Sequence, residues 1–179
     1  NVKDGVSVIT NADSGTVQGL ELEFLARPVA ALTLTANASY LDTAYGEFSD
    51  ADPVTNVVQG VEGNQFRYAP KHKVTLGAAY AFALGSDRTL SLRGDVTLVG
   101  KTHFSTTNNP ALTQPAYSLA NAAAEFTSGD GRWSLIAYCK NLGGEEYYRD
   151  KTWAGMVPGA YQGRVGDPRN AGLQFIYRY

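Results

Sequence analysis

Hydrophobic and polar residues alternate with a period of two in the last ten positions of the chain. One set consists of Ala171, Leu173, Phe175, Tyr177 and Tyr179, and the intervening set of Asn170, Gly172, Gln174 and Arg178. Successive side chains of a β-strand point to opposite faces, so this alternation predicts a strand with one apolar and one polar face. Only Ile176 departs from the pattern.

Six further segments show the same alternation, and a shorter strand is expected at residues 6–10. The pattern is clearest at 16–27, 32–44, 72–82 and 89–101, and it is weaker at 117–127 and 132–142. Within residues 32–44, for example, leucine and alanine alternate with threonine, asparagine and serine. Together with the last segment, the chain is predicted to contain about eight strands, most of them two-faced.

The connections between these strands are alternately short and long. Short, turn-forming segments rich in Pro, Gly, Ser and Asp separate long ones: the short ones are 28–31, 83–88 and 128–131, and the long ones are 45–71, 102–116 and 143–168. Outer-membrane barrels combine short periplasmic turns with long outer loops and give each strand a lipid face and a lumen face. The sequence therefore predicts an all-β protein, an antiparallel transmembrane β-barrel in the outer membrane of a Gram-negative bacterium, with a periplasmic C-terminus.

Aromatic residues lie near both ends of the predicted strands. Five of them are close to the short turns or the C-terminus, and two are close to the long loops: Phe24, Phe82, Phe126, Trp133 and Tyr177, then Tyr40 and Tyr117. Aromatic rings are enriched at the two membrane–water boundaries, so this placement agrees with the barrel prediction.

Composition agrees with a barrel and excludes several other classes. Hydrophobic residues make up 44% of the chain and charged residues 18%, which is an average expected when lipid-facing and lumen-facing residues alternate. No stretch approaches the roughly 18 apolar residues of a membrane helix. The net charge of −2 without a basic stripe argues against a nucleic-acid partner. The single cysteine, Cys139, cannot form an internal disulfide.

The sequence contains no catalytic or metal-binding motif. Its two histidines, His72 and His103, are far apart, and nucleophile-elbow, zinc-protease and cysteine-cluster patterns are missing from the sequence. The acidic residues of the first long loop, among them Asp50 and Asp52, do not have the spacing of a calcium loop and are expected to be solvated. We therefore predict that the protein is not an enzyme and has no cofactor and no metal site.

Three stretches resemble the carboxy-terminal part of a TonB-dependent outer-membrane receptor. The first is GLELEF at residues 19–24, followed by LTLTANASYLD at 32–42, and the second is APKH at 69–72. The third combines KNL at 140–142 and EYY at 146–148 with GDPR at 166–169. Each motif is degenerate, but their order and spacing together are specific.

The resemblance implies that residues 1–179 are the C-terminal portion of a larger, plugged barrel of the 22-stranded class. The N-terminal plug domain of such receptors is absent from this chain. The implied function is TonB-coupled uptake of a scarce nutrient, most often an iron–siderophore complex, with the chain supplying barrel wall and outer, ligand-facing loops. The implied partners are outer-membrane lipid, the TonB complex acting through the plug, and the barrel-assembly machinery.

Candidate ligand residues lie mainly in the last long loop, which mixes aromatic and cationic side chains. Charge and stacking of this kind suit an anionic, ring-bearing ligand such as a ferric siderophore. The candidates are His103, Tyr148, Arg149, Trp153, Tyr161 and Arg164. The terminal pattern of Leu173, Phe175, Tyr177 and Tyr179 resembles the signal that the barrel-assembly machinery reads.

Two alternatives remain open from the sequence. A self-contained, eight-stranded outer-membrane barrel with an adhesin or structural role fits the predicted strand number. A water-soluble all-β binding module would also carry two-faced strands, but its apolar faces would pack against a second layer.

Overall fold

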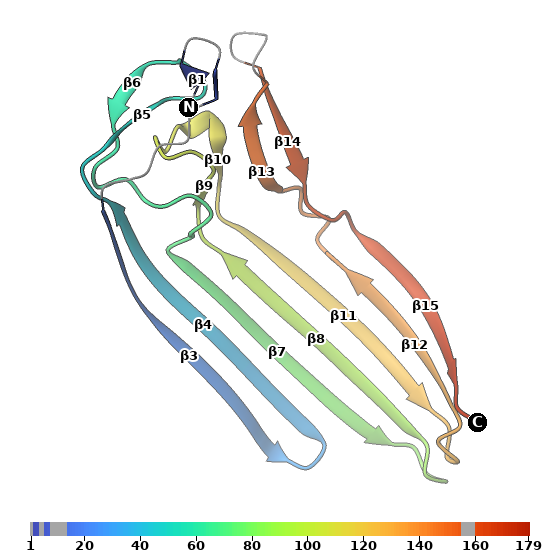
Figure 1. Cartoon of the computed structure of the whole chain (residues 1–179). Helices are drawn as coiled ribbons and strands as arrows, with labels where there is room; N and C mark the ends of the chain where they lie inside the picture. Colours follow the sequence, from blue (N-terminus) through green and yellow to red (C-terminus); the bar gives the residue numbers. More distant parts are fainter. Residues whose placement is uncertain (1, 4–5, 8–13, 155–159) are drawn as a thin grey trace.

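The computed structural model describes residues 2–3, 6–7, 14–154 and 160–179. Its main feature is one curved, antiparallel sheet of seven strands (Figure 1). These strands are β3 (Gly15–Val29), β4 (Leu32–Tyr45), β7 (His72–Ala83), β8 (Thr89–Val99), β11 (Tyr117–Thr127), β12 (Trp133–Lys140) and β15 (Asn170–Tyr177). Their order across the sheet is β15-β12-β11-β8-β7-β4-β3, so each strand lies beside its neighbour in sequence within this set.

The predicted wall strands and the short turns between them are confirmed. The short strand expected at residues 6–10 differs, because β2 (Val6–Ser7) pairs with β1 (Val2–Lys3) and not with the sheet. Residues 8–10 lie outside the described part of the chain. The described sheet therefore has seven strands, where the sequence suggested about eight. Its two edge strands, β3 and β15, lie at opposite ends of the sheet, and the barrel is not closed.

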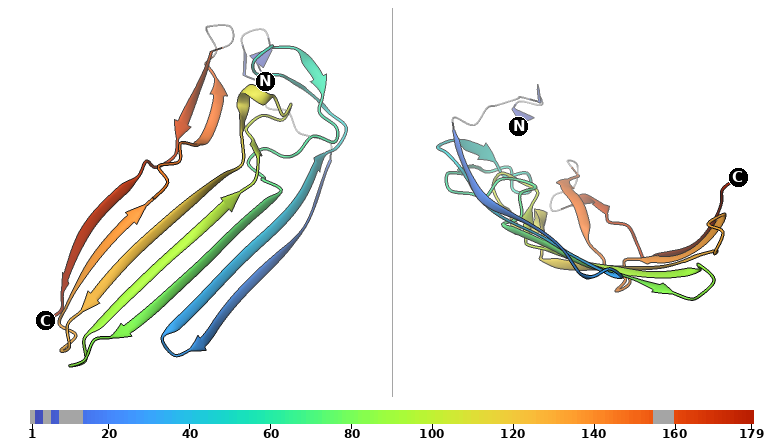
Figure 2. Two further views of the ribbon diagram at one scale, coloured as in Figure 1. Left: turned by 180° about the vertical axis from the view of Figure 1, so that it is seen from behind. Right: turned by 90° about the horizontal axis from the view of Figure 1, so that it is seen from below.

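The register of the strands collects apolar side chains on one face of the sheet. Leu20 lies opposite Tyr40 on the neighbouring strand, and Leu76 lies opposite Val96. Many of these side chains are exposed, at 73% for Leu20 and 75% for Leu173. In the described residues the sheet is a single layer with no second sheet on this face (Figure 2). The packing that a soluble sandwich requires is therefore missing from the described structure.

The opposite face of the sheet is mainly polar. Asn37 and Thr75 lie opposite one another on this face, as do Asp95 and Asn121. Thr75 and Thr97 share a hydrogen bond of 3.0 Å between their hydroxyls. This is the expected phase of a barrel strand, with lipid on one side and a polar lumen on the other.

The buried apolar residues lie mostly outside the sheet. Four of the five in the described structure belong to the long connections, namely Val61, Phe104, Leu112 and Tyr147, and the fifth, Ile136, is on β12. No helix in the described ranges is long and apolar enough to cross a membrane. The hydrophobic core of this chain is thus a loop core at one end of the sheet.

We expect a charge on the apolar face to destabilise the complete barrel and the same charge on the polar face to be tolerated. Leu76→Arg places a guanidinium in hydrocarbon at mid-strand and should lower the free energy of unfolding by about 2–4 kcal/mol. Asn37→Arg, on the polar face of the adjacent strand, is the control and should change it by less than about 0.5 kcal/mol. Urea titration of the barrel refolded into lipid vesicles measures both. Equal losses would contradict the assignment of the faces.

Candidate ligand-binding site

The three long loops lie at the same end of the sheet (Figure 1). They contain the short elements β5 (Ser49–Ala51), β6 (Val58–Gly60), β9 (Thr102–His103), the 3₁₀-helix η1 (Pro110–Leu112), β10 (Thr113–Gln114), β13 (Tyr148–Trp153) and β14 (Tyr161–Val165). β5 pairs with β6, β9 with β10, and β13 with β14. Each long loop therefore contains a small two-stranded antiparallel sheet of its own.

Asp52 joins the first two loops. Its side chain is 3% exposed and accepts hydrogen bonds from the Thr107 hydroxyl at 2.7 Å and from the Asn109 amide at 2.9 Å. Backbone N–H groups of Val54 and Thr55 also donate to it. Burial alone would raise the pKa of this carboxyl, but these hydrogen bonds outweigh burial and lower the pKa to about 2. The expectation that Asp52 is solvated is therefore wrong, because its partners come from a loop more than fifty residues away.

His103 is buried and contacts residues of the first and second long loops. It is 8% exposed, and its Nδ1 lies 3.0 Å from the Thr113 hydroxyl on the paired strand β10. Its backbone carbonyl accepts a 2.9 Å hydrogen bond from the N–H of Tyr68. Burial, together with the charge of Lys101, lowers the pKa of His103 below its ordinary value. The imidazole is therefore neutral at pH 7 and does not supply a positive charge.

The hairpin of β13 and β14 is attached to both other loops. The N–H of Tyr148 donates to the Gln114 side chain at 2.9 Å, and the Lys151 ammonium reaches the Thr113 carbonyl at 3.4 Å. The Tyr68 hydroxyl donates to the Asp150 carboxylate at 2.8 Å. The Lys151 ammonium also lies 4.3 Å from the centre of the Tyr148 ring, a cation–π distance.

A cavity of about 770 Å³ lies where the loops meet the sheet. Its wall combines four tyrosines with two cations and one carboxylate: Tyr40, Tyr68, Tyr117, Tyr148, Lys73, Arg149 and Glu21. The Arg149 guanidinium is paired with Asp167 at 2.5 Å. Within the described residues no carboxylate lies within ion-pair distance of Lys73. This cavity offers flat aromatic surfaces beside two cations and one carboxylate, and it is our candidate ligand-binding site.

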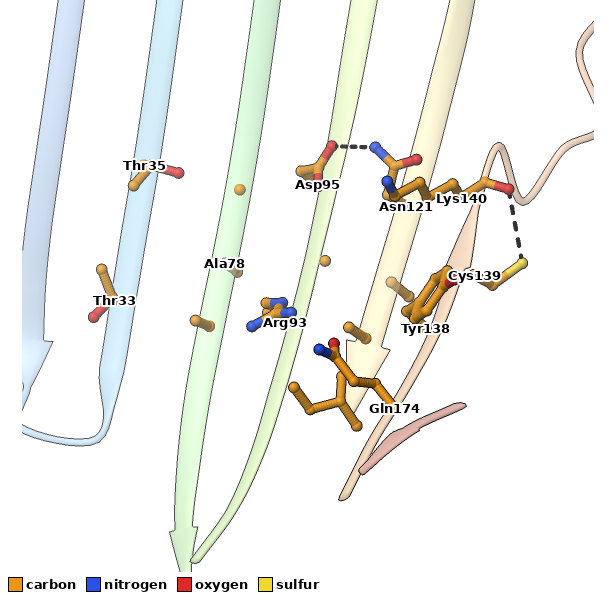
Figure 3. A pocket seen from close by; sticks show the side chains of 16 residues that line it. Thr33, Thr35, Ala78, Arg93, Asp95, Asn121, Tyr138, Cys139, Lys140 and Gln174 are labelled. Carbon is orange, nitrogen blue, oxygen red and sulfur yellow. Dashed lines mark hydrogen bonds between the residues drawn. The ribbon is translucent and has the colours of Figure 1, made fainter. Parts of the chain in front are cut away.

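A second cavity, of about 830 Å³, lies on the polar face nearer the middle of the sheet. Figure 3 shows Arg93, Asp95 and Asn121 on two neighbouring strands that line it. The Asn121 amide donates to Asp95 at 2.7 Å, and Arg93 pairs with Glu125 at 3.9 Å. Arg93 and Asp95 thus have partners on the wall itself.

The predicted ligand residues occupy different positions. Tyr148 and Arg149 line the first cavity, whereas His103 is buried and does not line it. Trp153 and Tyr161 pair with one another across the hairpin, and Arg164 lies 3.8 Å from Asp150. The structure therefore brings two of the six candidates into the cavity.

Sequence reasoning missed Tyr68, Lys73 and Tyr117 as cavity residues. The alternation within residues 72–82 places Lys73 on the polar face, next to a long loop, so its position could have been predicted from the sequence. Tyr117 was interpreted as a lipid-boundary ring, but it points to the polar face and stacks on Tyr147 with 4.6 Å between ring centres. Tyr68 carried no signal, because its position depends on contacts with the other two loops.

The terminal aromatic pattern lies on the apolar face. Leu173, Phe175 and Tyr177 pair with Ala137, Leu135 and Trp133 of β12, and their side chains are at least half exposed. Tyr179 follows the end of β15 and is fully exposed.

Metal-binding groups of three or more His, Cys, Asp or Glu side chains are missing from the part of the chain that the structure describes.

Together these features define a class of protein. A curved antiparallel sheet with one exposed apolar face, short turns at one end and packed loops at the other is the wall of an outer-membrane β-barrel. A family model described as TonB dependent receptor-like, beta-barrel matches residues 1–142. The chain therefore belongs to the β-barrel family of TonB-dependent receptors, which are transport receptors of the Gram-negative outer membrane.

Solved structures share the fold. The ferric yersiniabactin uptake receptor FyuA from Yersinia pestis superposes with a TM-score of 0.75 at 19% identity, over 92% of this chain and 24% of the receptor. The ferric preacinetobactin receptor BauA from Acinetobacter baumannii gives 0.70 at 21% identity, over 91% and 22%. The ferric citrate transporter FecA gives 0.62 at 17%, over 91% and 24%. None of the curated proteins matches the sequence.

The chain thus spans less than a quarter of the length of these three receptors. The predicted family and fold class are confirmed, and the open sheet is explained as a fragment of a barrel.

We expect the junction between the first two loops to lose stability in acid. The pKa of Asp52 is about 2 in the folded chain and 3.8 for a free side chain, so its stabilisation is complete above pH 4 and disappears as the pH falls towards 2. The difference corresponds to about 2 kcal/mol. Asp52→Ala should remove it at neutral pH, and amide exchange of residues 52–57 and 105–109 should then accelerate at least about tenfold. Asp87→Ala, in a short turn at the other end, is the control; an equal effect would contradict the role of Asp52.

Proposed function

We propose that this chain forms the C-terminal wall of a TonB-coupled receptor that takes up an iron–siderophore complex across the outer membrane. The observation that carries the proposal is the cavity between the loops and the sheet, where Lys73 and Arg149 lie beside four tyrosines. The fold family and the likeness to three receptors for ferric complexes support an iron complex as the cargo. The role is binding and transport rather than catalysis.

The cavity chemistry suits an anionic ligand that contains rings. Lys73 provides a positive charge without a carboxylate partner among the described residues, and Tyr68 and Tyr148 provide rings that are 52% and 37% exposed. Cations and aromatic faces together favour anionic ring systems through charge and stacking. We propose five residues of the cavity wall as ligand contacts: Lys73, Arg149, Tyr68, Tyr117 and Tyr148. We propose that Trp153, Tyr161 and Arg164, on the hairpin of β13 and β14, meet the ligand as it enters the cavity.

The proposed orientation follows from the loops. The alternation of long loops and short turns supports an orientation with β13 and β14 outside the cell and the C-terminus in the periplasm. A plug domain outside this chain would contact the polar face and the TonB complex. The exposed Leu173, Phe175, Tyr177 and Tyr179 would be read by the barrel-assembly machinery during insertion into lipid.

A self-contained small barrel is less well supported. Such a barrel needs an even number of strands and a seam between its first and last strands. The described sheet has seven strands, and its edge strands β3 and β15 do not pair with one another.

We expect Lys73→Gln in the complete receptor to weaken ligand binding by about tenfold, because it removes a charge-assisted contact. The probes are ferric citrate, ferric yersiniabactin and ferric preacinetobactin, and fluorescence titration of the receptor in detergent measures each affinity. Lys101→Gln, an exposed cation that does not line the cavity, is the control and should bind like the unchanged receptor.

Uptake in cells tests the proposed cargo. A strain that lacks the receptor gene should lose uptake of the iron complex that binds, and a gene copy with Lys73→Gln should restore it poorly at low concentration. Normal uptake of all three ferric probes by the deletion strain would contradict the iron proposal.

A further inference from the structure

Tyr68 has a backbone conformation that is unusual for an aromatic residue. Its φ is +58°, in the left-handed region that a bulky side chain rarely adopts. Such strain persists where surrounding contacts hold the residue in place, and it occurs often at ligand sites and switches. Tyr68 is 52% exposed and lines the candidate cavity, so burial does not explain the conformation.

Three contacts hold Tyr68, and they come from two different loops. Its N–H donates to the His103 carbonyl at 2.9 Å, and its ring centre lies 5.6 Å from that of Phe104. Its hydroxyl donates to Asp150 at 2.8 Å, across 82 positions of sequence. The first two contacts fix the backbone and the ring, and the third connects the side chain to the hairpin of β13 and β14.

Asp150 is placed to receive this hydroxyl. It lies beside a register shift in β13, and its second oxygen is 3.8 Å from the Arg164 guanidinium on β14. Burial and the neighbouring carboxylate raise the pKa of Tyr68, so its hydroxyl keeps its proton and remains a donor at neutral pH. Among the described residues this hydrogen bond is the one that joins the first long loop directly to the hairpin.

The hairpin otherwise stands apart from the first loop. Figure 1 shows β13 and β14 as a separate arm above the end of β12 and β15. Its other attachments, from Tyr148 and Lys151, reach residues 113 and 114 of the second loop. Tyr148 and Arg149 at the base of this arm line the cavity, so the position of the arm sets the position of two cavity residues.

We propose that the hydrogen bond between Tyr68 and Asp150 is a latch that holds the hairpin to the first long loop at the edge of the cavity. A ligand that stacks on Tyr68 or takes its hydroxyl competes with Asp150 and frees the hairpin. Tyr68 is then a positioning residue for the hairpin as well as part of the cavity wall. The identity of the competing ligand rests on the proposed function, but the latch itself does not.

Hydrogen exchange of the complete receptor without ligand tests the latch. Tyr68→Phe keeps the ring and removes only the hydroxyl, and it should accelerate amide exchange in residues 148–153 and 161–165 by about tenfold. Asp150→Ala should have an effect of similar size, and the double variant should exchange no faster than the faster single variant, because both changes remove the same contact. Tyr161→Phe on the same hairpin, and Arg164→Gln, which removes only the ion pair, are the controls and should change exchange less than about twofold.

The outcomes separate the latch from the transport proposal. If Tyr68→Phe accelerates hairpin exchange no more than Tyr161→Phe, or if the two single variants add, the latch is wrong even when a ferric probe binds. If the hairpin is released as expected while ferric citrate, ferric yersiniabactin and ferric preacinetobactin all fail to bind, the latch stands and the proposed cargo fails. If one probe binds, it should accelerate hairpin exchange in the unchanged receptor and have little further effect in Tyr68→Phe; acceleration of equal size in both would also overturn the latch.

Discussion

The structure depends on the requirement that every peptide N–H and C=O in hydrocarbon finds a partner within the protein. An antiparallel sheet meets this requirement for its inner strands, and each strand can then present leucine and valine to lipid without losing hydrogen bonds. The outer edges of β3 and β15 have no partner strand among the described residues. Since relatives of known structure are about four times longer, the missing partners of these edges belong to the rest of the barrel.

The same requirement explains why the hydrophobic core is in an unusual place. Lipid replaces the second layer that a soluble sheet needs, so the wall has no internal core of its own. The loops are in water and must pack against one another to stay ordered. They do so around Val61, Phe104, Leu112 and Tyr147, with Asp52 as a buried polar connection. The cavity lies at the boundary between these two environments, with a rigid sheet on one side and packed loops on the other.

Sequence alone predicted the wall well and the site only in part. Alternation in the wall is imposed by lipid at every second position, so strands such as β4 and β8 could be located, and the residues of each face assigned, without a structure. β13 and β14 were not predicted, because neither face of the hairpin is apolar and its sequence therefore shows no alternation of hydrophobic and polar residues. The burial of Asp52 and the position of Tyr68 depend on partners that are 35 to 82 residues away, and no local pattern reports such distances.

In the wall strands, alternate residues face lipid and lumen, and this constrains how the sequences of such proteins can change in evolution. Inserting one residue into a strand such as β7 would exchange the faces of all residues beyond it, placing threonine and lysine in lipid and leucine in the lumen. Insertions of two residues preserve the faces but displace the ladder. The loops have no such alternation and can accept any change in length that preserves their contacts. Evolutionary change in ligand range is therefore expected to accumulate as loop insertions and deletions, on a wall whose strand lengths hardly vary.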